Sequence, residues 1–321
     1  MRKKLFWQFI ALLVVIGVSI FIGRYSLLTM NYDEWNNQFL WNLIFKLRIP
    51  RVLTAVIAGA ALSLSGYVIQ TILHNPLADP GIIGISQASG FGAALGILLF
   101  ESSSISTQLL AFIFSLTALG LTFFLAKQTR SNDILAVVLS GIAVSAIFSA
   151  GLGLIKYIAD PIDQLPNIVF WLLGSISNVN WQDLIVLLCI TLPIMVLLWF
   201  YRWRLNIFQL EDEIAFSLGM NKNIERILII CCAVLLTSSV ISFTGIIGWV
   251  GLIIPNMSRF LWGQNAMESL PKSALLGALF LLICDNFSRL LLPGEIPLGI
   301  LTAFFGSLLF VYFLVKRKLL K

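Results

Sequence analysis

The chain has 321 residues, of which 59% are hydrophobic and 11% are charged, and its mean hydropathy is +0.96. Soluble domains carry about 25% charged residues, so this composition excludes a soluble globular protein and predicts an integral membrane protein. The net charge of +6 comes from basic residues at the ends of apolar segments, which indicates membrane topology and not nucleic-acid binding.

The apolar segments are continuous, whereas the strands of a membrane β-barrel alternate in shorter runs, so we predict an all-α polytopic membrane protein. A helix needs about 20 apolar residues to cross a membrane, and the chain therefore allows about ten transmembrane helices in a single domain, residues 1–321. Residues 165–175 are too few to span, and we expect a re-entrant or surface helix there. The expected spans, in chain order, cover residues 5–28, 52–73, 85–100, 109–126, 134–158, 184–201, 227–243, 245–263, 273–292 and 298–315.

The first expected span begins with a basic cluster and so resembles a signal peptide. It lacks a small-residue cleavage site and its apolar run is long enough to span, so we expect it to remain as the first helix. With the N-terminus in the cytoplasm, 15 of the 21 Lys and Arg residues fall on the cytoplasmic side. The positive-inside rule then predicts that both termini are cytoplasmic.

Residues 202–226 form the longest polar interval of the chain, with a long apolar segment on each side. Ile207, Leu210, Ile214 and Leu218 recur at three and four residues, which predicts one apolar ridge on a short helix. Such a helix in water favours a docking element for a partner. An ordinary solvated loop helix would show the same spacing and remains an alternative.

The ends of this short helix are also marked. Glu211, Asp212 and Glu213 crowd its expected first turn, where the helix dipole favours acidic side chains. Gly219 is a natural stop because glycine accepts the left-handed conformation. Asn221 is expected to cap a second helix, which continues into the next apolar segment.

Two arginines, Arg48 and Arg51, lie in the motif RIPR on the expected external side, ahead of the span at 52–73. Their position runs against the positive-inside rule. One interpretation is a socket for acidic groups of an external protein, because an arginine can bind a carboxylate with two hydrogen bonds. Contact with lipid headgroups is the alternative.

The segment HNPLADPG follows that span, and its two prolines interrupt the helix at the expected inner mouth. Irregular backbone at membrane depth is tolerated only where protein or a water-filled cavity surrounds it. We therefore place Asn75, Pro76 and Leu77 beside a pathway, with a plain turn between helices as the alternative. His74 is the only histidine, so we expect no histidine-based metal site.

Asp285 and Arg289 lie four residues apart in the span at 273–292, where they can pair on one helix face. Charges at such depth usually face the bundle interior or water. The four cysteines all lie in apolar segments without metal-ligand spacing, so we expect packing roles for them. No phosphate-binding loop or metalloprotease or serine-nucleophile motif is present, and the chain is not expected to be an enzyme.

Four stretches, taken in chain order, resemble the FecCD family. Its members are the ten-helix permease subunits of ATP-binding-cassette (ABC) importers for iron–siderophores, haem and vitamin B12. The stretches are RIPRVLTAVIAGAALSLSGYVIQ, HNPLADPGIIGISQASGFGA, LEDEIAFSLG, and GIIGWVGLIIPNMSR through SALLGALFLLICDNFSRLLLPGEIPLGILTAFFGS.

The resemblance implies the type II ABC importer permease fold in the cytoplasmic membrane of a bacterium. It also implies a second permease subunit, identical or homologous, two cytoplasmic ABC ATPases and an extracellular substrate-binding protein, usually a lipoprotein. ATP and Mg would bind to the ATPases, so no cofactor and no metal is expected on this chain. Beyond these proteins it would contact membrane lipid but no nucleic acid.

The resemblance also implies roles for single residues. Arg48, Arg51 and, less closely, Arg289 match arginines that grip acidic residues of the binding protein. Asn75 and Leu77 match the inner gate of the pathway, and Ser131 and Asn132 match a second gate element loosely. The coupling helices lie at about residues 205–226, and the ATPase-coupling residues would be Leu210, Glu211, Asp212, Glu213, Ala215, Leu218 and Gly219.

The sequence departs from the family pattern at three positions. Family members usually have glycine at Glu211, a basic residue at Phe216 and histidine at Asn256. The first two departures suggest a particular, matched ATPase.

The implied function is translocation of an iron–siderophore complex by alternating access, with haem or vitamin B12 as alternative substrates. A secondary transporter driven by an ion gradient would need intramembrane acids. Among the acidic residues only Asp285 lies deep in an expected span, and Arg289 is near enough to pair with it, so the sequence does not favour a secondary transporter.

Overall fold

The computed structural model describes residues 2–23, 38–100, 104–128, 134–292 and 294–319. The described part of the chain is all-helical and contains no strand, as the fold class predicts. Its helices are α1 (Arg2–Phe21), α2 (Gln38–Asn42), η3 (Leu43–Arg48), α3 (Ile49–Ile72), η4 (Pro80–Ile83), α4 (Ile85–Leu99), α5 (Ser104–Gln128), α6 (Ile134–Ile158), α7 (Gln164–Leu173), α8 (Trp181–Ile207), α9 (Asp212–Ser217), α10 (Lys222–Thr244), α11 (Val250–Trp262), α12 (Ala266–Leu290) and α13 (Leu298–Leu319).

Among the described residues, six helices are long and apolar enough to cross a membrane, judged by length and composition. They include α3, α5, α6, α8, α10 and α12, which coincide with six of the expected spans. Four further expected spans coincide with α1, α4, α11 and α13; of these, α4 has 15 residues and α11 only 13. The exact number of ten spans therefore stays a prediction. The short segment near residue 170 is a helix of 10 residues.

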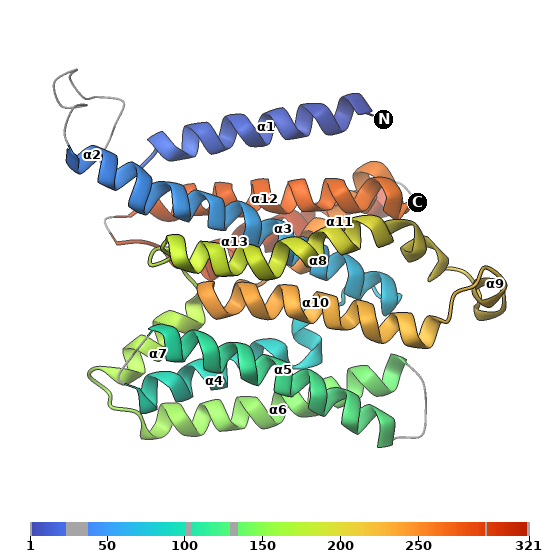
Figure 1. Ribbon diagram of the computed structural model, residues 1–321, viewed down its shortest axis with the longest axis horizontal. Helices are drawn as coiled ribbons and strands as arrows, with labels where there is room; N and C mark the ends of the chain where they lie inside the picture. The colour runs from blue at the N-terminus through green and yellow to red at the C-terminus, as the bar shows by residue number, and fades with distance from the viewer. Residues whose placement is uncertain (1, 24–37, 101–103, 129–133, 293, 320–321) are drawn as a thin grey trace.

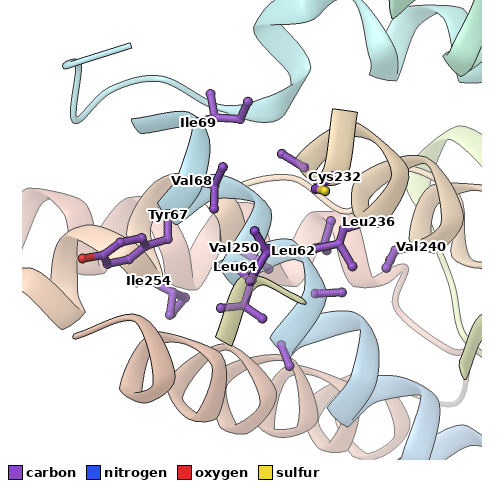
Figure 2. Close-up of a cluster of buried hydrophobic side chains, with 14 of the residues drawn as sticks. Leu62, Leu64, Tyr67, Val68, Ile69, Cys232, Leu236, Val240, Val250 and Ile254 are labelled. Atoms are coloured by element: carbon purple, nitrogen blue, oxygen red, sulfur yellow. The ribbon is translucent and has the colours of Figure 1, made fainter. Parts of the chain in front are cut away.

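Helix α3 is the centre of the molecule, since nearly all of its residues are buried. It packs against α8, α10, α11 and α12. Figure 2 shows the cluster in which Leu62, Leu64 and Val68 of α3 lie among side chains of α10 and α11. A central position requires a narrow helix, because neighbouring backbones must approach it closely.

Two glycines make this close approach possible. A Cβ added at Gly66 would overlap the carbonyl oxygen of Gly251, and one added at Gly59 would overlap that of Gly277. Backbone contact of this kind is typical of membrane helices, whose association depends on packing and not on expulsion of water. The small residues of α3 thus set its distance from α11 and α12.

Buried hydroxyl groups join α3 to the same neighbours. Ser63 Oγ lies 2.8 Å from Ser273 Oγ in α12, and Ser65 Oγ lies 2.7 Å from Thr237 Oγ1 in α10. Tyr67 Oη lies 2.7 Å from Ser269 Oγ in α12. Each of these groups would be costly to bury alone, so the hydrogen bonds fix the register of the helices as well as their distance.

Helices α4, α5, α6 and α7 form a second group beside this centre, seen along the lower edge of Figure 1. Their contacts include a cluster of three aromatic rings, Phe91, Phe114 and Phe148, with centroids 5.0 to 6.1 Å apart. Helices α10 and α5 connect this group to the centre.

The molecule has two distinct ends along its long axis. In Figure 1 the start of α1, the end of α13 and the short helix α9 all lie at one end, and α2 and α7 lie at the other. We call these the α9 end and the α2 end. The two termini therefore share an end with the polar interval, as the predicted topology requires.

Candidate functional site

The polar interval at the α9 end forms the short helix that the sequence predicts, but with only six residues, Asp212–Ser217. Glu211 takes the position before the first turn, and Asp212 and Glu213 lie within that turn. Gly219 adopts a φ of +77°, the left-handed conformation that a helix end favours. The Asn221 side chain then caps α10, accepting from the backbone N–H groups of Asn223 (3.2 Å) and Ile224 (3.4 Å).

The predicted apolar ridge on one helix is wrong in part, because Ile207 and Leu210 both lie before α9. Ile207 is the last residue of α8 and is only 4% exposed, because α8 continues to that point before the chain turns towards α9. Three- and four-residue spacing across two helices does not place side chains on one face. Ala215, by contrast, is fully buried against the rest of the protein.

The segment around α9 nevertheless exposes several apolar side chains beside its acidic first turn. Leu210, Ile214 and Leu218 are 42%, 47% and 53% exposed. Phe216, which the ridge pattern omits, is the most exposed of the group at 75%. We call these four side chains the α9 patch. Neighbouring apolar side chains exposed together outside the expected spans indicate a partner surface.

Lys222 holds α9 against α10. Its Nζ lies 2.8 Å from Asp212 Oδ1 and also donates to the carbonyl oxygen of Leu210. The hydrogen bond and charge of Lys222 lower the pKa of Asp212 below its ordinary value. The Asp212 side chain is 86% exposed, so the pair adds little stability, and its effect is to fix the position of α9 on α10.

A second polar contact joins α8 to α10 close by. Arg204 Nη2 donates to Glu225 Oε1 over 2.6 Å, and the Tyr201 hydroxyl donates to the other oxygen of Glu225. The two helices that flank α9 are therefore tied to each other, and α9 is tied to the start of one of them.

The loop after α3 contains the predicted gate residues Asn75 and Leu77, and both are exposed. Asn75 Oδ1 accepts from the backbone N–H of Leu77 over 2.9 Å, which makes the sharp turn at Pro76. Asn256 Nδ2 in α11 donates to the carbonyl oxygen of Pro76 over 2.6 Å. His74 Nε2 forms a 2.8 Å hydrogen bond with the carbonyl oxygen of Phe208, just before α9.

A pocket of about 490 Å³ opens beside this loop. Arg259 provides the one guanidinium group among the described lining residues. This group donates hydrogen bonds to Gln70 Oε1 (2.6 Å), the carbonyl oxygen of Tyr67 (2.8 Å) and Thr71 Oγ1 (3.0 Å). The described lining residues include no Asp or Glu; they are Gln70, Thr71, His74, Pro76, Leu77, Gln209, Ile253, Asn256, Arg259, Phe260, Gln264, Phe310 and Phe313. Leu77 in the loop after α3 and Gln209 just before the α9 patch therefore border the same cavity.

The arginines expected to dock an external protein are buried at the opposite, α2 end. Arg48, Arg51 and Arg289 are only 6%, 8% and 6% exposed. Arg51 Nε donates to Asp285 Oδ1 over 2.8 Å, and Arg51 Nη1 donates to Glu295 Oε1 over 2.8 Å. Arg289 Nη2 lies 3.1 Å from Asp285 Oδ2, so the predicted pairing within α12 is confirmed.

Arg48 and Arg289 also cap the C-terminal end of α1. Arg48 Nη1 donates to the carbonyl oxygens of Ile20 (3.0 Å) and Phe21 (3.1 Å). Arg289 Nη1 donates to those of Ser19 (3.2 Å) and Ile22 (3.0 Å). Positive charge at a helix C-terminus is favourable, so these arginines also have a structural role that the sequence pattern did not indicate.

The FecCD transport family model matches residues 10–316 of the chain. The chain belongs to this family. It is similar to the molybdate import system permease protein MolB of Haemophilus influenzae, with 38% identity over 98% of this chain and 96% of that protein. It is also similar to a probable iron chelatin transport system permease of Helicobacter pylori (35% identity; 96% and 97% covered) and to the hemin transport system permease HmuU of Yersinia pestis (32%; 99% and 97%).

Two solved structures have related folds. One is the inward-facing conformation of an ABC transporter assigned to the metal-chelate type, with a TM-score of 0.91, 38% identity, and coverage of 98% of this chain and 100% of that one. The other is PsaBC from Streptococcus pneumoniae in complex with Fab, with a TM-score of 0.60, 18% identity, and coverage of 87% and 92%, which indicates the fold alone. The chain is thus an ABC importer permease of the FecCD family.

Within this FecCD permease, one of the two predicted groups of gate residues lies in the part of the chain that the structure describes. The predicted gate residues Asn75 and Leu77 lie in the loop that the hydrogen bond of His74 with Phe208 joins to the stretch before α9. Ser131 and Asn132 lie outside the described residues. Sequence reasoning missed Lys222, Glu295 and the contact of Asn256 with the gate loop, since each depends on which elements meet in space.

Proposed function

We propose that this chain is the transmembrane permease subunit of an importer that carries an iron–siderophore complex across the bacterial cytoplasmic membrane. The observation that carries the proposal is the α9 patch, an exposed apolar surface at the end that holds both chain termini. This end would face the cytoplasm, where a separate ATPase would cover the patch. The ATPase would bind ATP and Mg, and this chain would bind neither.

The polar contacts around α9 suggest how ATPase motion would reach the pathway. A push on α9 would pass through Lys222 to α10, which packs along the central helix α3. The loop at the end of α3 contains Asn75 and Leu77 and is joined by His74 to the residue range before α9. Movement at α9 would therefore displace the gate loop. Two copies of the permease, or this chain with a homologue, would enclose the pathway.

The proposed external partner is a substrate-binding protein that docks at the α2 end. The described cluster of Arg48, Arg51 and Arg289 has one more positive charge than the two carboxylates paired within it, Asp285 and Glu295, which would favour acidic groups on such a protein. Because these arginines already have partners within the chain, docking would depend on rearrangement of their present contacts.

Two observations bear on the cargo. Named relatives include iron chelate, hemin and molybdate permeases. The pocket near Arg259 contains no carboxylate among its described lining residues, which would favour an anionic cargo over a bare metal cation. The relative that is 38% identical transports molybdate, so molybdate is a second candidate.

Uptake by cells that express or lack the chain tests this proposal. Cells with the chain should accumulate radioactive iron from ferric siderophores, and deletion should abolish that uptake. Uptake of labelled molybdate with unchanged iron uptake would select the second candidate. Haem and vitamin B12 serve as competitors in the same assay. Affinity purification from gently solubilised membranes should recover an ATPase and a substrate-binding protein with the tagged permease.

A further inference from the structure

The connection between α12 and α13 places an acidic side chain on the docking arginines at the α2 end. Glu295 Oε1 accepts from Arg51 Nη1 over 2.8 Å. The Glu295 side chain is 35% exposed, whereas that of Arg51 is 9% exposed. Glu295 therefore lies between a buried guanidinium and the surface, and it occupies the Nη1 donor of Arg51.

The charges around Arg51 do not balance. The described cluster consists of three guanidinium groups, those of Arg48, Arg51 and Arg289, and two carboxylates, those of Asp285 and Glu295. Arg51 Nη2 is buried and makes no hydrogen bond. A buried donor without an acceptor is unfavourable, so Arg51 has hydrogen-bonding capacity that its present partners do not use.

Only one of the two carboxylates is free to leave. Asp285 is completely buried and lies between Arg51 and Arg289, and removal of its charge would leave two guanidinium groups facing each other. Glu295 reaches solvent and contacts one arginine among the described ion pairs. Exchange of the Glu295 carboxylate for another would preserve the charge of the cluster.

The backbone beside Glu295 is anchored independently of its side chain. Ser288 Oγ donates to the carbonyl oxygen of Ile296 over 2.6 Å, and the Ile296 N–H donates to the carbonyl oxygen of Ser288 over 3.3 Å. The Leu298 N–H donates to the carbonyl oxygen of Gly174 over 2.8 Å. The Glu295 side chain can therefore rotate away while the connection keeps its position.

We propose that Glu295 is a resident carboxylate which an acidic side chain of the docked substrate-binding protein displaces from Arg51. This inference rests on the proposed function, since it requires such a partner. Glu295 keeps Arg51 paired while the permease is free, and it competes with the partner for the same donor. It therefore weakens docking, and an importer must release its binding protein after each delivery.

The test measures docking of the substrate-binding protein recovered in the purification above to the full permease in lipid nanodiscs. Glu295→Gln keeps the shape of the side chain but removes its charge, so docking should become about two- to fivefold tighter, mainly through faster association. Glu295→Asp is the second variant, because a shorter carboxylate should compete less and give an intermediate affinity. Arg51→Lys should weaken docking in every background.

Glu268→Gln is the matched control, because Glu268 forms an ion pair of the same kind with Lys272 (3.3 Å) at the start of α12. It should leave docking unchanged. Unchanged or weaker docking of both folded Glu295 variants would overturn the competition while leaving the proposed function intact. If the wild-type permease binds no such protein, the docking partner in the proposed function is wrong and the competition is wrong with it.

Discussion

The side-chain amide of Asn256 lies 2.6 Å from the carbonyl oxygen of Pro76, and so joins α11 to the loop after α3 that contains the predicted gate residues Asn75 and Leu77. The same Nδ2 also donates to Leu252 O over 2.8 Å, within α11. The resemblance to FecCD permeases implies a histidine at this position, where the present chain has Asn256. An amide N–H and an imidazole N–H can both donate to a carbonyl oxygen, which gives the departure a simple structural meaning.

Asn256→Leu should loosen the gate loop, because leucine has a similar size but no donor. Loss of one hydrogen bond costs about 1 kcal/mol, so the backbone amides of Asn75, Leu77 and Ala78 should exchange hydrogen about fivefold faster. Hydrogen exchange followed by mass spectrometry measures this. Asn256→His should keep the exchange rate near that of the wild type, and equal exchange in the leucine variant would show that the bond does not hold the loop.

Phe216→Ala should weaken binding of the ATPase. Burying a phenylalanine side chain contributes about 1.5–3 kcal/mol, so the dissociation constant should rise by one to two orders of magnitude. Co-purification and a binding titration with the purified ATPase measure the effect. Phe170→Ala is the control, since Phe170 is 66% exposed in α7 at the opposite end and should have no influence.

Lys222→Met should uncouple ATP hydrolysis from transport. The variant keeps the four side chains of the α9 patch but removes the contacts with Asp212 and Leu210 that hold α9 on α10. We expect the ATPase to remain bound and active while uptake falls about tenfold, which corresponds to loss of about 1.4 kcal/mol of coupling free energy between α9 and the rest of the permease. Parallel hydrolysis and uptake assays in proteoliposomes measure the ratio. The exchanged pair Lys222→Asp with Asp212→Lys should recover part of the uptake, and uptake equal to wild type in the single variant would argue against this route.

Gly66→Ala should destabilise the folded bundle, because the added Cβ overlaps the carbonyl oxygen of Gly251. Overpacking of a tight core costs about 1–3 kcal/mol, so the melting temperature in detergent should fall by several degrees. Gly120→Ala is the matched control in α5, where a Cβ meets no atom within 4 Å. A similar melting temperature for both variants would contradict the close contact of α3 with α11.

Asp79→Asn should stabilise the protein in a pH-dependent manner. Burial raises the pKa of Asp79 from 3.8 to about 6, although its hydrogen bond from the Gly81 N–H acts in the opposite direction. The folded state therefore holds this proton more tightly than the unfolded chain, and stability falls as the pH rises from about 4 to about 6. Asparagine has no such ionisation, so the gain in melting temperature should be larger at pH 7.5 than at pH 5. An equal gain at both pH values would exclude the ionisation as its cause.

Several local features could be predicted from the sequence because neighbouring residues determine them. The limits of α6, the stop at Gly219 and the cap at Asn221 follow from hydrophobic length, from the left-handed preference of glycine and from a side-chain acceptor next to free N–H groups. The ion pair of Asp285 with Arg289 follows from helical spacing. The apolar ridge failed at Ile207 because spacing does not reveal where one helix ends and the next begins.

The sequence by itself determined that this protein is a bundle of apolar helices with a short capped helix at the end that holds both termini. Only the tertiary structure decided that Arg51 meets Asp285, 234 residues away, and Glu295, and that Asn256 meets Pro76. Apolar length and capping act within one or two turns of a helix, so they can be read locally. The partner of a buried charge depends on how distant helices pack, and in this chain glycines and hydroxyl groups of α3 fix that packing.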